Sequence, residues 1–424
     1  MAKTAVVVGA GVAGLTAAWR LAQAGWQVEI VERTQAVGGL LAGPVVDGVA
    51  CDLGAHRLHP QALAVRAVAD LSALTPLVPR PRCGKIVLNG RHLHYPLAVG
   101  DLARSLGVVA GARLALGFAM APRWHSRDPT ADVGFAQFVI ARAGRAAYAA
   151  FYRPYAEKVW GIDPGELSQS CAKQRVASAA PWRSVLRGRA KAKFLLPAGG
   201  FAQWIAALLA EATALGASLR LGHSGPLPQA DAVLDSGHLG EMTTDPHLQH
   251  AGLQLVWLRC SGADLGPADT WYCPERKFWF GRVTHVGRFT ADPAAQGLLC
   301  VELPQGARPD LPDWRPRLPE LVDQLRQARI VPASATVTFA AQRDLPRVYP
   351  LYRVGWRAQW DRAMASACSD GKTWPIGRQG LWLHCNIDHA MATAEAAVAE
   401  IVAGRPSQAW PQVAAQFLGA QVRD

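Results

Sequence analysis

The sequence predicts an α/β fold in which a parallel sheet carries covering helices and a second part is built from an antiparallel sheet and helices. The apolar run at residues 5–8 carries no charge and precedes a glycine-rich turn and a helix-forming stretch at 15–24. Such a run is typical of a buried parallel strand. Residues 253–303 contain several strand-like runs, and the Ala- and Glu-rich residues 390–402 predict a final helix.

The first forty residues form a strand, turn, helix and strand that end in an acid. Gly9, Gly11 and Gly14 lie between the first strand and the helix, and a second strand at 27–31 is followed by Glu32. In this pattern the glycines permit a tight turn, a close approach to a pyrophosphate and close helix–sheet packing. The helix N-terminus favours the negative pyrophosphate, and the acid accepts hydrogen bonds from an adenosine ribose and repels the 2′-phosphate of NADP. The unit predicts a Rossmann-type dinucleotide site.

A second glycine pair favours FAD as the dinucleotide. Gly38-Gly39-Leu40 lies shortly after Glu32 and Arg33. This pair resembles the extended fingerprint of FAD-binding proteins of the glutathione-reductase structural class, which plain NAD dehydrogenases usually lack. The N-terminal residues that we expect to contact FAD are Gly9, Gly11, Val12, Ala13, Gly14, Glu32, Arg33, Gly38, Gly39 and Leu40.

The composition indicates a folded basic protein. The 424 residues include 44 Lys and Arg against 32 Asp and Glu, a formal net charge of +12. This charge favours an anionic substrate or an acidic membrane surface, whereas the scattered arginines do not indicate nucleic acid. The eight cysteines show no metal-binding spacing, so we expect reduced thiols and no metal site. We expect a cytoplasmic protein without a signal peptide.

No apolar stretch is long and uncharged enough to predict a membrane-spanning helix. Residues 106–122 come closest, but Arg113 interrupts them. We interpret this stretch as a helix of the substrate domain. A weak peripheral attachment to the inner membrane face is the less favoured alternative.

A loop rich in His and Arg follows the first predicted hairpin. Asp47-Gly48 predicts the hairpin turn, and residues 52–60 follow it. Because Gly54 allows a close backbone approach, we expect this loop to line the flavin or the substrate. A coincidental surface cluster is the alternative. The residues assigned here are Gly54, Ala55, His56 and Arg57 for the cofactor, with His56 and His59 as candidates for proton transfer.

An aromatic block lies in the helical stretch that precedes residue 176. Its sequence at 151–161 is FYRPYAEKVWG, with Leu167 and Gln174-Arg175 further along. The block resembles the substrate-domain signature shared by UDP-galactopyranose mutases and bacterial protoporphyrinogen-oxidase-like flavoenzymes of the amine-oxidase type. The resemblance implies that Tyr155 and Arg175 lie at the substrate. An aromatic-rich helical core would also explain the block.

Residues 253–303 predict the antiparallel sheet beneath the substrate, and Asn89-Gly90 predicts a further hairpin at 85–96. Phe280-Gly281-Arg282 resembles the family's aromatic-x-Arg strand, whose Arg faces an anionic substrate in the sugar mutases. An Arg held among aromatic residues needs an anionic partner. The residues leave open whether Arg282 meets a substrate or Glu302.

The C-terminal segment resembles two further family elements. Tyr349 lies in a segment at 348–352 that resembles a second Tyr-bearing strand, and residues 377–391 resemble a Gly-Arg-x-Gly strand that leads through Asn-x-Asp into a final helix. The amides of that helix would stabilise negative charge on a reduced flavin. The residues that this motif assigns to FAD are Gly377, Arg378, Asn386, Asp388, His389 and Ala390.

The resemblance spans nearly the whole chain in four separate blocks and implies an interrupted FAD domain. We expect FAD-binding segments at 1–84, 191–245 and 346–424. A mostly helical substrate segment is expected at 85–190, and an antiparallel one at 246–345.

The resemblance implies an FAD-dependent oxidase, dehydrogenase or desaturase that takes a hydride from a small or lipid-like substrate, anionic or isoprenoid, onto flavin N5. The alternative is a non-redox mutase that uses reduced FAD on a nucleotide-sugar, with Arg175 and Arg282 on the diphosphate and Trp160 on the uracil. A third alternative is an FAD-stabilised binding protein without turnover. The candidate catalytic residues are His56, His59, Tyr155, Arg175, Arg282 and Tyr349.

Overall fold

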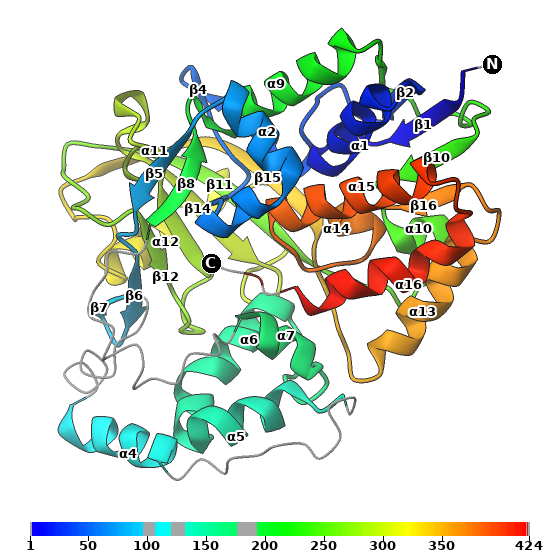
Figure 1. The fold of residues 1–424 in the computed structure, drawn as a ribbon. Coiled ribbons are helices and arrows are strands. Elements are labelled where there is room, and N and C mark those ends of the chain that lie inside the picture. Colours follow the sequence, from blue (N-terminus) through cyan, green and yellow to red (C-terminus); the bar gives the residue numbers. More distant parts are fainter. Residues whose placement is uncertain (1, 96–106, 120–131, 176–192, 421, 423–424) are drawn as a thin grey trace.

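The computed structural model describes residues 2–95, 107–119, 132–175, 193–420 and 422. It confirms the mixed α/β fold. A parallel sheet with its helices, a larger antiparallel sheet and a lobe of helices lie around a shared centre (Figure 1). The expected boundary near residue 190 lies outside the described residues.

The parallel sheet joins strands from three distant parts of the sequence. Within the described ranges its order is β16-β10-β1-β2-β9, and all neighbouring strands are parallel. Val7 and Ile30 are fully buried, because helices cover the strands on both faces. The five strands are β1 (Thr4–Val8), β2 (Gln27–Glu32), β9 (Ser218–Leu221), β10 (Ala232–Asp235) and β16 (Thr373–Pro375).

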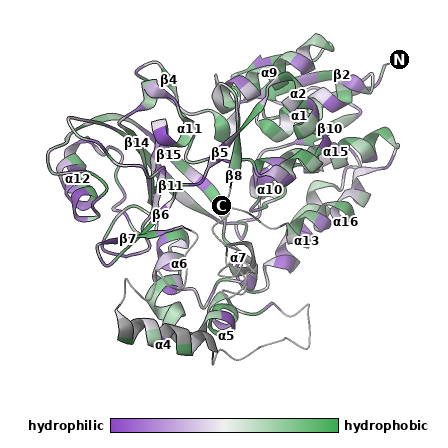
Figure 2. Ribbon diagram, turned by 60° about the vertical axis from the view of Figure 1, so that its left-hand side comes forward, coloured by the Kyte–Doolittle hydropathy of each residue, from purple (hydrophilic) through white to green (hydrophobic). Residues whose placement is uncertain are grey.

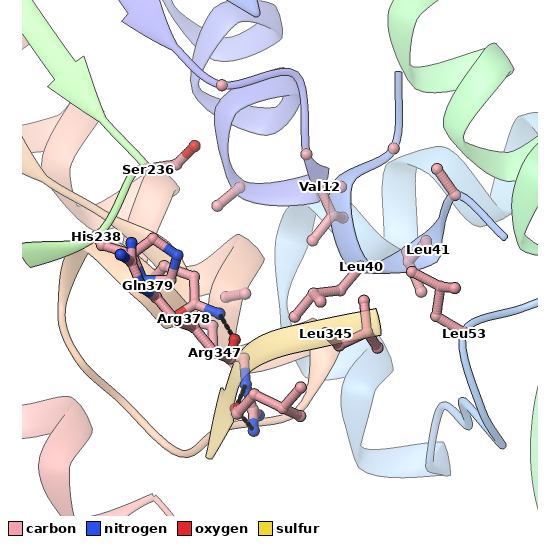
Figure 3. A pocket seen from close by; sticks show the side chains of 18 of the residues that line it. Val12, Leu40, Leu41, Leu53, Ser236, His238, Leu345, Arg347, Arg378 and Gln379 are labelled. Atoms are coloured by element: carbon pink, nitrogen blue, oxygen red, sulfur yellow. Dashed lines mark hydrogen bonds between the residues drawn. The ribbon is translucent and has the colours of Figure 1, made fainter. Parts of the chain in front are cut away.

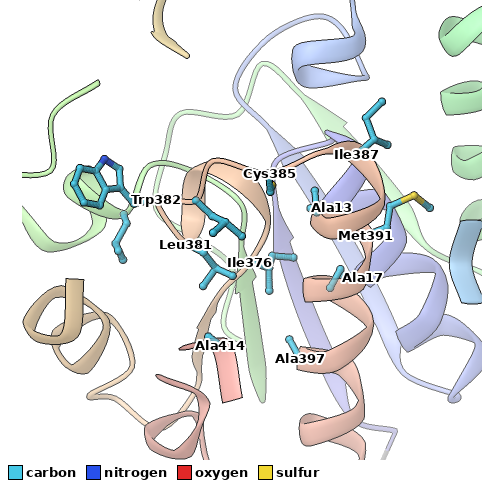
Figure 4. Packing of buried hydrophobic residues seen from close by; sticks show 14 of the residues in the cluster. Ala13, Ala17, Ile376, Leu381, Trp382, Cys385, Ile387, Met391, Ala397 and Ala414 are labelled. Carbon is cyan, nitrogen blue, oxygen red and sulfur yellow. The ribbon is translucent and has the colours of Figure 1, made fainter. Parts of the chain in front are cut away.

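Helix α1 is the centre of the packing beside this sheet. It contacts α15 and α9, and Figure 4 shows Ala13 and Ala17 of α1 close to Met391 of α15. The small alanine side chains allow the two helix backbones to approach closely. The helices of this region are α1 (Val12–Gln23), α2 (Arg66–Leu74), α9 (Gly200–Ala214), α10 (Leu239–Thr243), α13 (Trp356–Ala367), α14 (Gly377–Gly380), α15 (Ile387–Val402) and α16 (Trp410–Ala414).

The antiparallel sheet has the order β15-β11-β14-β13-β12-β6-β7 in the described chain, with β6 and β12 as its parallel pair. Both of its faces are buried: Leu255 and Trp257 face one core, and Val256 and Leu258 face another. This alternation follows from the two-residue period of a strand. The strands are β6 (Lys85–Leu88), β7 (Arg91–His94), β11 (His250–Ser261), β12 (Thr270–Tyr272), β13 (Arg282–His285), β14 (Leu298–Pro304) and β15 (Thr336–Pro350).

Two predicted hairpin turns are confirmed. Asp47 and Gly48 have φ values of 50° and 80°, and Asn89 and Gly90 have 51° and 70°. Positive φ at both central residues is the turn that matches the twist of the flanking strands. The first turn joins β3 (Val45–Val46) to β4 (Val49–Ala50), and the second joins β6 to β7. A separate strand pair is formed by β5 (Leu77–Pro81) and β8 (Lys193–Pro197).

The helical lobe lies at the end of the molecule away from the parallel sheet (Figure 1). It consists of α4 (Val108–Ala119), α5 (Phe135–Ala147), a π-turn (Tyr148–Tyr152), α6 (Arg153–Trp160) and α7 (Gln169–Arg175). Near the antiparallel sheet lie α11 (Val286–Thr290) and α12 (Leu318–Gln327). The 3-10 turns are Gly39–Leu41, Pro60–Ala64, Pro293–Ala295, Arg315–Arg317, Ser407–Ala409 and Ala415–Gly419.

The structure corrects the C-terminal prediction in two places. Gly377–Gly380 forms the short helix α14 and not a strand, because Gly377 has φ +71° and turns the chain at the end of β16. The final helix begins at Ile387, three residues before Ala390, because Asn386 caps it.

All eight cysteines are free thiols, and Cys83 is the exposed one. Among the helices of the described segments, none has the length and apolar character needed to cross a bilayer.

Candidate functional site

A cavity of about 1270 Å³ lies at the carboxyl ends of β1, β2 and β10 and extends to the antiparallel sheet and α6. The carboxyl ends of parallel strands are where α/β sheets bind ligands. Its volume exceeds the usual range of about 300–1000 Å³ for one small-molecule pocket. Figure 3 shows apolar Val12, Leu40 and Leu53 on one side, and polar His238 and Arg378 on the other. The cavity therefore has room for a large amphipathic ligand together with a second molecule.

The glycine turn is shaped for close approach. Gly9 has φ +95°, and a Cβ there would lie 2.3 Å from the Oγ of Ser236. A Cβ on Gly14 would lie 1.9 Å from the carbonyl oxygen of Gly9, and the amide of Gly38 donates to Ala10. Only glycine fits at Gly9 and Gly14. The turn therefore keeps the packing that a dinucleotide pyrophosphate requires.

The N-terminus of α1 points its first-turn residues at this cavity. Gly11 is the N-cap and has no side chain to cap the helix, and Val12 and Ala13 line the cavity. Amides at an uncapped helix N-terminus favour a negatively charged group. These residues therefore fit a cofactor pyrophosphate.

Glu32 lies at the end of β2 with part of its acceptor capacity in use. One carboxylate oxygen accepts the amide of Ala10 at 2.9 Å, and the other accepts the amide and hydroxyl of Thr34 at 2.9 and 2.8 Å. A carboxylate accepts about four hydrogen bonds. Glu32 lines the cavity, and its remaining acceptor capacity fits a ribose hydroxyl.

Arg378 and the N-terminus of α15 form the opposite wall. The guanidinium of Arg378 donates to the carbonyls of Val348 and Cys385, so it joins β15 to the loop before α15. Asn386 and Ala390 line the cavity. This wall places a helix N-terminus beside the cavity, as the C-terminal motif predicted.

Several residues assigned to the cofactor support the cavity without lining it. Gly14, Gly54 and Gly377 pack behind its surface, and a Cβ on Gly377 would lie 2.6 Å from the Cβ of Ala13. His389 belongs to a capping box with Asn386, and Asp388 lies in the first turn of α15. Asp388 and His389 therefore contribute to the helix end rather than to the cavity lining.

The predicted residues that line the cavity are Gly9, Gly11, Val12, Ala13, Glu32, Arg33, Gly38, Gly39, Leu40, Ala55, His56, Arg57, Tyr155, Arg282, Tyr349, Arg378, Asn386 and Ala390. They come from four of the five expected segments of the chain, and the segment at 191–245 contributes none of the predicted residues.

His56 is a neutral imidazole in this environment. Burial, with the nearby charges of Arg282 and Arg378, lowers the pKa of His56 to about 3. Its Nδ1 is buried and has no hydrogen-bond partner among the residues that the structure describes. His56 therefore does not change charge near neutral pH, unlike an ordinary histidine. His59 caps a 3-10 turn and does not line the cavity.

Aromatic side chains line the part of the cavity next to the antiparallel sheet. Tyr155 stacks on Phe151 with ring centroids 6.0 Å apart, and Tyr349 lies beneath the Arg378 guanidinium. The phenol of Tyr272 accepts a hydrogen bond from Arg57 at 3.1 Å. This compartment offers flat apolar surfaces with a few polar edges, which is typical of a site for an organic substrate.

Arg282 and Glu302 form an ion pair in this compartment. They are register partners on β13 and β14, and the Nε of Arg282 donates to Glu302 at 2.6 Å. Although burial opposes its charge, Glu302 raises the pKa of Arg282 above its ordinary value. A Cβ on Gly54 would lie 3.1 Å from Glu302, so the His-rich loop packs directly on the pair. Of the two partners left open by the sequence, Glu302 is the one that contacts Arg282 in the structure.

Of the two residues that belong to the mutase alternative alone or in part, Trp160 is placed differently from the prediction, and the prediction for Arg175 stays untested. Trp160 is only 3% exposed and packs edge-on against Phe135, because it belongs to the main hydrophobic core. It does not line the cavity and is not placed to stack on a base there. Arg175 ends α7, and its side chain lies outside the described residues.

Sequence reasoning missed several cavity residues, among them Ser236, His238, Tyr272 and Arg347. Ser236 had a usable signal, since it follows a short apolar run at 232–234 and Asp235, and strand ends carry ligand contacts. The others had none, because their access to the cavity depends on how distant segments assemble.

The fold and the site define a dinucleotide-binding protein with a second compartment beside the dinucleotide cavity. Residues 12–224 match the family of flavin-containing amine oxidoreductases. Since this match covers half of the chain, the protein belongs to that family, and the predicted flavin cofactor, FAD, is confirmed.

Three further comparisons describe the similarity. A probable UDP-galactopyranose mutase of Klebsiella pneumoniae is 26% identical over 176 residues, which cover 41% of this chain and 44% of that protein. The match thus spans less than half of either chain. A crystal structure of reduced UDP-galactopyranose mutase superposes with a TM-score of 0.82 at 18% identity over 100% of both chains. A putative protoporphyrinogen oxidase from Exiguobacterium sp. 255-15 gives 0.72 at 16% identity, over 96% of this chain and 100% of the other. These superpositions show that this chain and the two solved structures share a fold.

Proposed function

We propose that the chain is an FAD-dependent oxidoreductase that oxidises a small or lipid-like organic substrate at a carbon beside nitrogen, oxygen or a double bond. Family membership supports the redox class. The observation that carries the substrate class is the Arg282–Glu302 pair, with side chains 19% and 5% exposed. Because the carboxylate already neutralises this arginine, the compartment favours an uncharged group over a diphosphate at this point.

The residues of the cavity divide into two sets with different tasks. Val12 and Ala13 would hold the cofactor pyrophosphate with their amides, and Glu32 would hold the ribose. Bound FAD would supply the hydride acceptor. The N-terminus of α15 would stabilise negative charge beside Asn386.

The second set would orient the substrate. Tyr155, Tyr272 and Tyr349 supply ring faces for an apolar substrate and phenol groups for its polar atoms. His56 is neutral, so it would act as a hydrogen-bond donor or acceptor and not as a cationic acid near neutral pH. These groups would hold the reacting carbon in position, and such positioning lowers the barrier to the reaction.

A second candidate is a non-redox mutase that uses reduced FAD on a nucleotide-sugar. The 26% identity to the probable mutase of Klebsiella pneumoniae favours it. The buried position of Trp160 and the paired state of Arg282 weigh against it.

An anaerobic absorbance experiment separates the two candidates. The FAD-loaded protein is mixed with panels of amines, polyunsaturated lipids and isoprenoids, without an external reductant. Bleaching of the flavin band by one of these substrates alone is the expected result. If no substrate bleaches the flavin, and the dithionite-reduced protein interconverts UDP-galactopyranose and UDP-galactofuranose, the redox proposal is wrong and the mutase is correct.

A further inference from the structure

The outer face of α4 exposes apolar side chains to solvent. Val109 is 69% exposed and Leu116 is 59% exposed. Ala112 and Arg113 are also exposed. Their spacing of three, four and seven residues places all four on one face of the helix. α4 therefore presents an apolar stripe with one cation in it.

The opposite face of α4 packs against α5, which fixes the direction of the stripe. Gly111 is buried, and a Cβ on Gly144 of α5 would lie 2.6 Å from the carbonyl oxygen of Gly117. Gly144 has φ +82° and kinks α5 at this contact. Figures 1 and 2 place α4 at the outer end of the helical lobe. The exposed side chains are thus on the face that α5 leaves uncovered.

The charged side chains of α4 and α5 are all positive. Neither α4 nor α5 contains an Asp or Glu, whereas Arg113, Arg142 and Arg145 are all exposed. The whole chain carries a net charge of +12. Basic residues near an anionic membrane strengthen binding, and apolar side chains at a helix surface insert into the headgroup region.

We propose that the outer face of α4 binds an anionic membrane surface. The twelve residues of α4 span about 18 Å, less than the ~30 Å hydrocarbon core, so the helix would lie along the surface and not cross it. A second copy of the chain fits this face less well, since a two-fold contact through it would bury Arg113 of both copies with no carboxylate from α4 or α5 to pair them. The proposal is independent of the reaction proposed above.

The test is co-sedimentation of the FAD-loaded protein with vesicles of phosphatidylcholine alone or mixed with phosphatidylglycerol. The critical variant is V109D/L116D. Its matched control is V45D/L74D, which adds the same charge at side chains that are 70% and 53% exposed. We expect binding to the mixed vesicles that weakens with salt, at least tenfold weaker binding of V109D/L116D, and an unchanged control. Equal FAD content and circular dichroism show that both variants fold.

Three outcomes would overturn the proposal. The first is an absence of binding to the mixed vesicles, and the second is an equal loss of binding in both double variants. The third is a concentration-dependent dimer that V109D/L116D abolishes without any effect on vesicle binding, which would assign the face to a second copy of the chain.

Discussion

Replacement of Lys158 by methionine tests how the substrate compartment is held together. Lys158 lies on α6 with 1% exposure, and its ammonium donates to the carbonyls of Cys273, Glu275 and Phe280 at 2.9, 2.6 and 2.9 Å. These carbonyls precede Arg282, which lines the cavity. The ammonium therefore fixes the approach to β13 against the helix that carries Tyr155.

The expected cost follows from these bonds. A hydrogen bond from a charged donor contributes about 1.5–3 kcal/mol, so the loss of three removes about 4.5–9 kcal/mol. Burial disfavours the charged form and lowers the pKa of Lys158 from 10.5 to about 8. Because methionine carries no charge, the substitution removes this cost of burial and so offsets about 3 kcal/mol of the loss. We therefore expect Lys158→Met to lower the free energy of unfolding by about 1.5–6 kcal/mol.

The assay is urea unfolding of the FAD-loaded protein, followed by tryptophan fluorescence. The matched control is Lys277→Met, a lysine that is 54% exposed beside Glu275, which should change the free energy by less than about 0.5 kcal/mol. The reasoning is wrong if Lys158→Met costs no more than Lys277→Met.

The pH dependence gives a second check on Lys158. Between its folded pKa of about 8 and its ordinary value of 10.5, the unfolded chain holds a proton that the folded chain has released. The contribution of Lys158 to the free energy of unfolding therefore increases with pH in that window. Below it, the full cost of burying the charged ammonium applies. We expect the stability difference between the wild type and Lys158→Met to widen from pH 8 to 10. A constant or narrowing difference would refute the assigned burial of the ammonium.

Further predictions concern the cofactor turn, the ion pair and the cavity-lining histidine, His56. Gly9→Ala should lose most of its FAD, measured as flavin absorbance per protein, because a Cβ at this position has no space. The control Gly25→Ala should keep its FAD, because Gly25 also has a positive φ of +81° but a Cβ there would meet no atom of the described residues within 4 Å. Glu302→Gln should cost about 3–5 kcal/mol in urea unfolding, since it leaves Arg282 buried and unpaired; a neutral result would contradict the pairing. His56→Gln should leave the apparent pKa values of kcat/KM between about pH 5 and 8 unchanged, because His56 is already neutral there. If the pH profile of His56→Gln lacks an inflection that the wild type shows in that range, His56 takes up a proton there and the prediction is wrong.

The sequence alone determined the features that depend on neighbouring residues. The turn from Gly9 to Gly14 and the acid at Glu32 follow from residue type and short spacing, since few residues tolerate positive φ or close helix packing. The hairpin turn at Asn89-Gly90 follows for the same reason. The resemblance of separate motifs then indicated the family, which the comparisons confirm.

Only the tertiary structure decided which distant groups meet. Glu302 partners Arg282 because β13 and β14 pair in one register, and a shift by one residue would have turned the two side chains apart. Trp160 is buried because α6 packs one face inward, although its motif suggested a ligand contact. Lys158 meets three carbonyls more than a hundred residues away. Local patterns specify turns and element types, whereas partners and burial depend on the assembly of distant segments, and these set the charge of the substrate compartment.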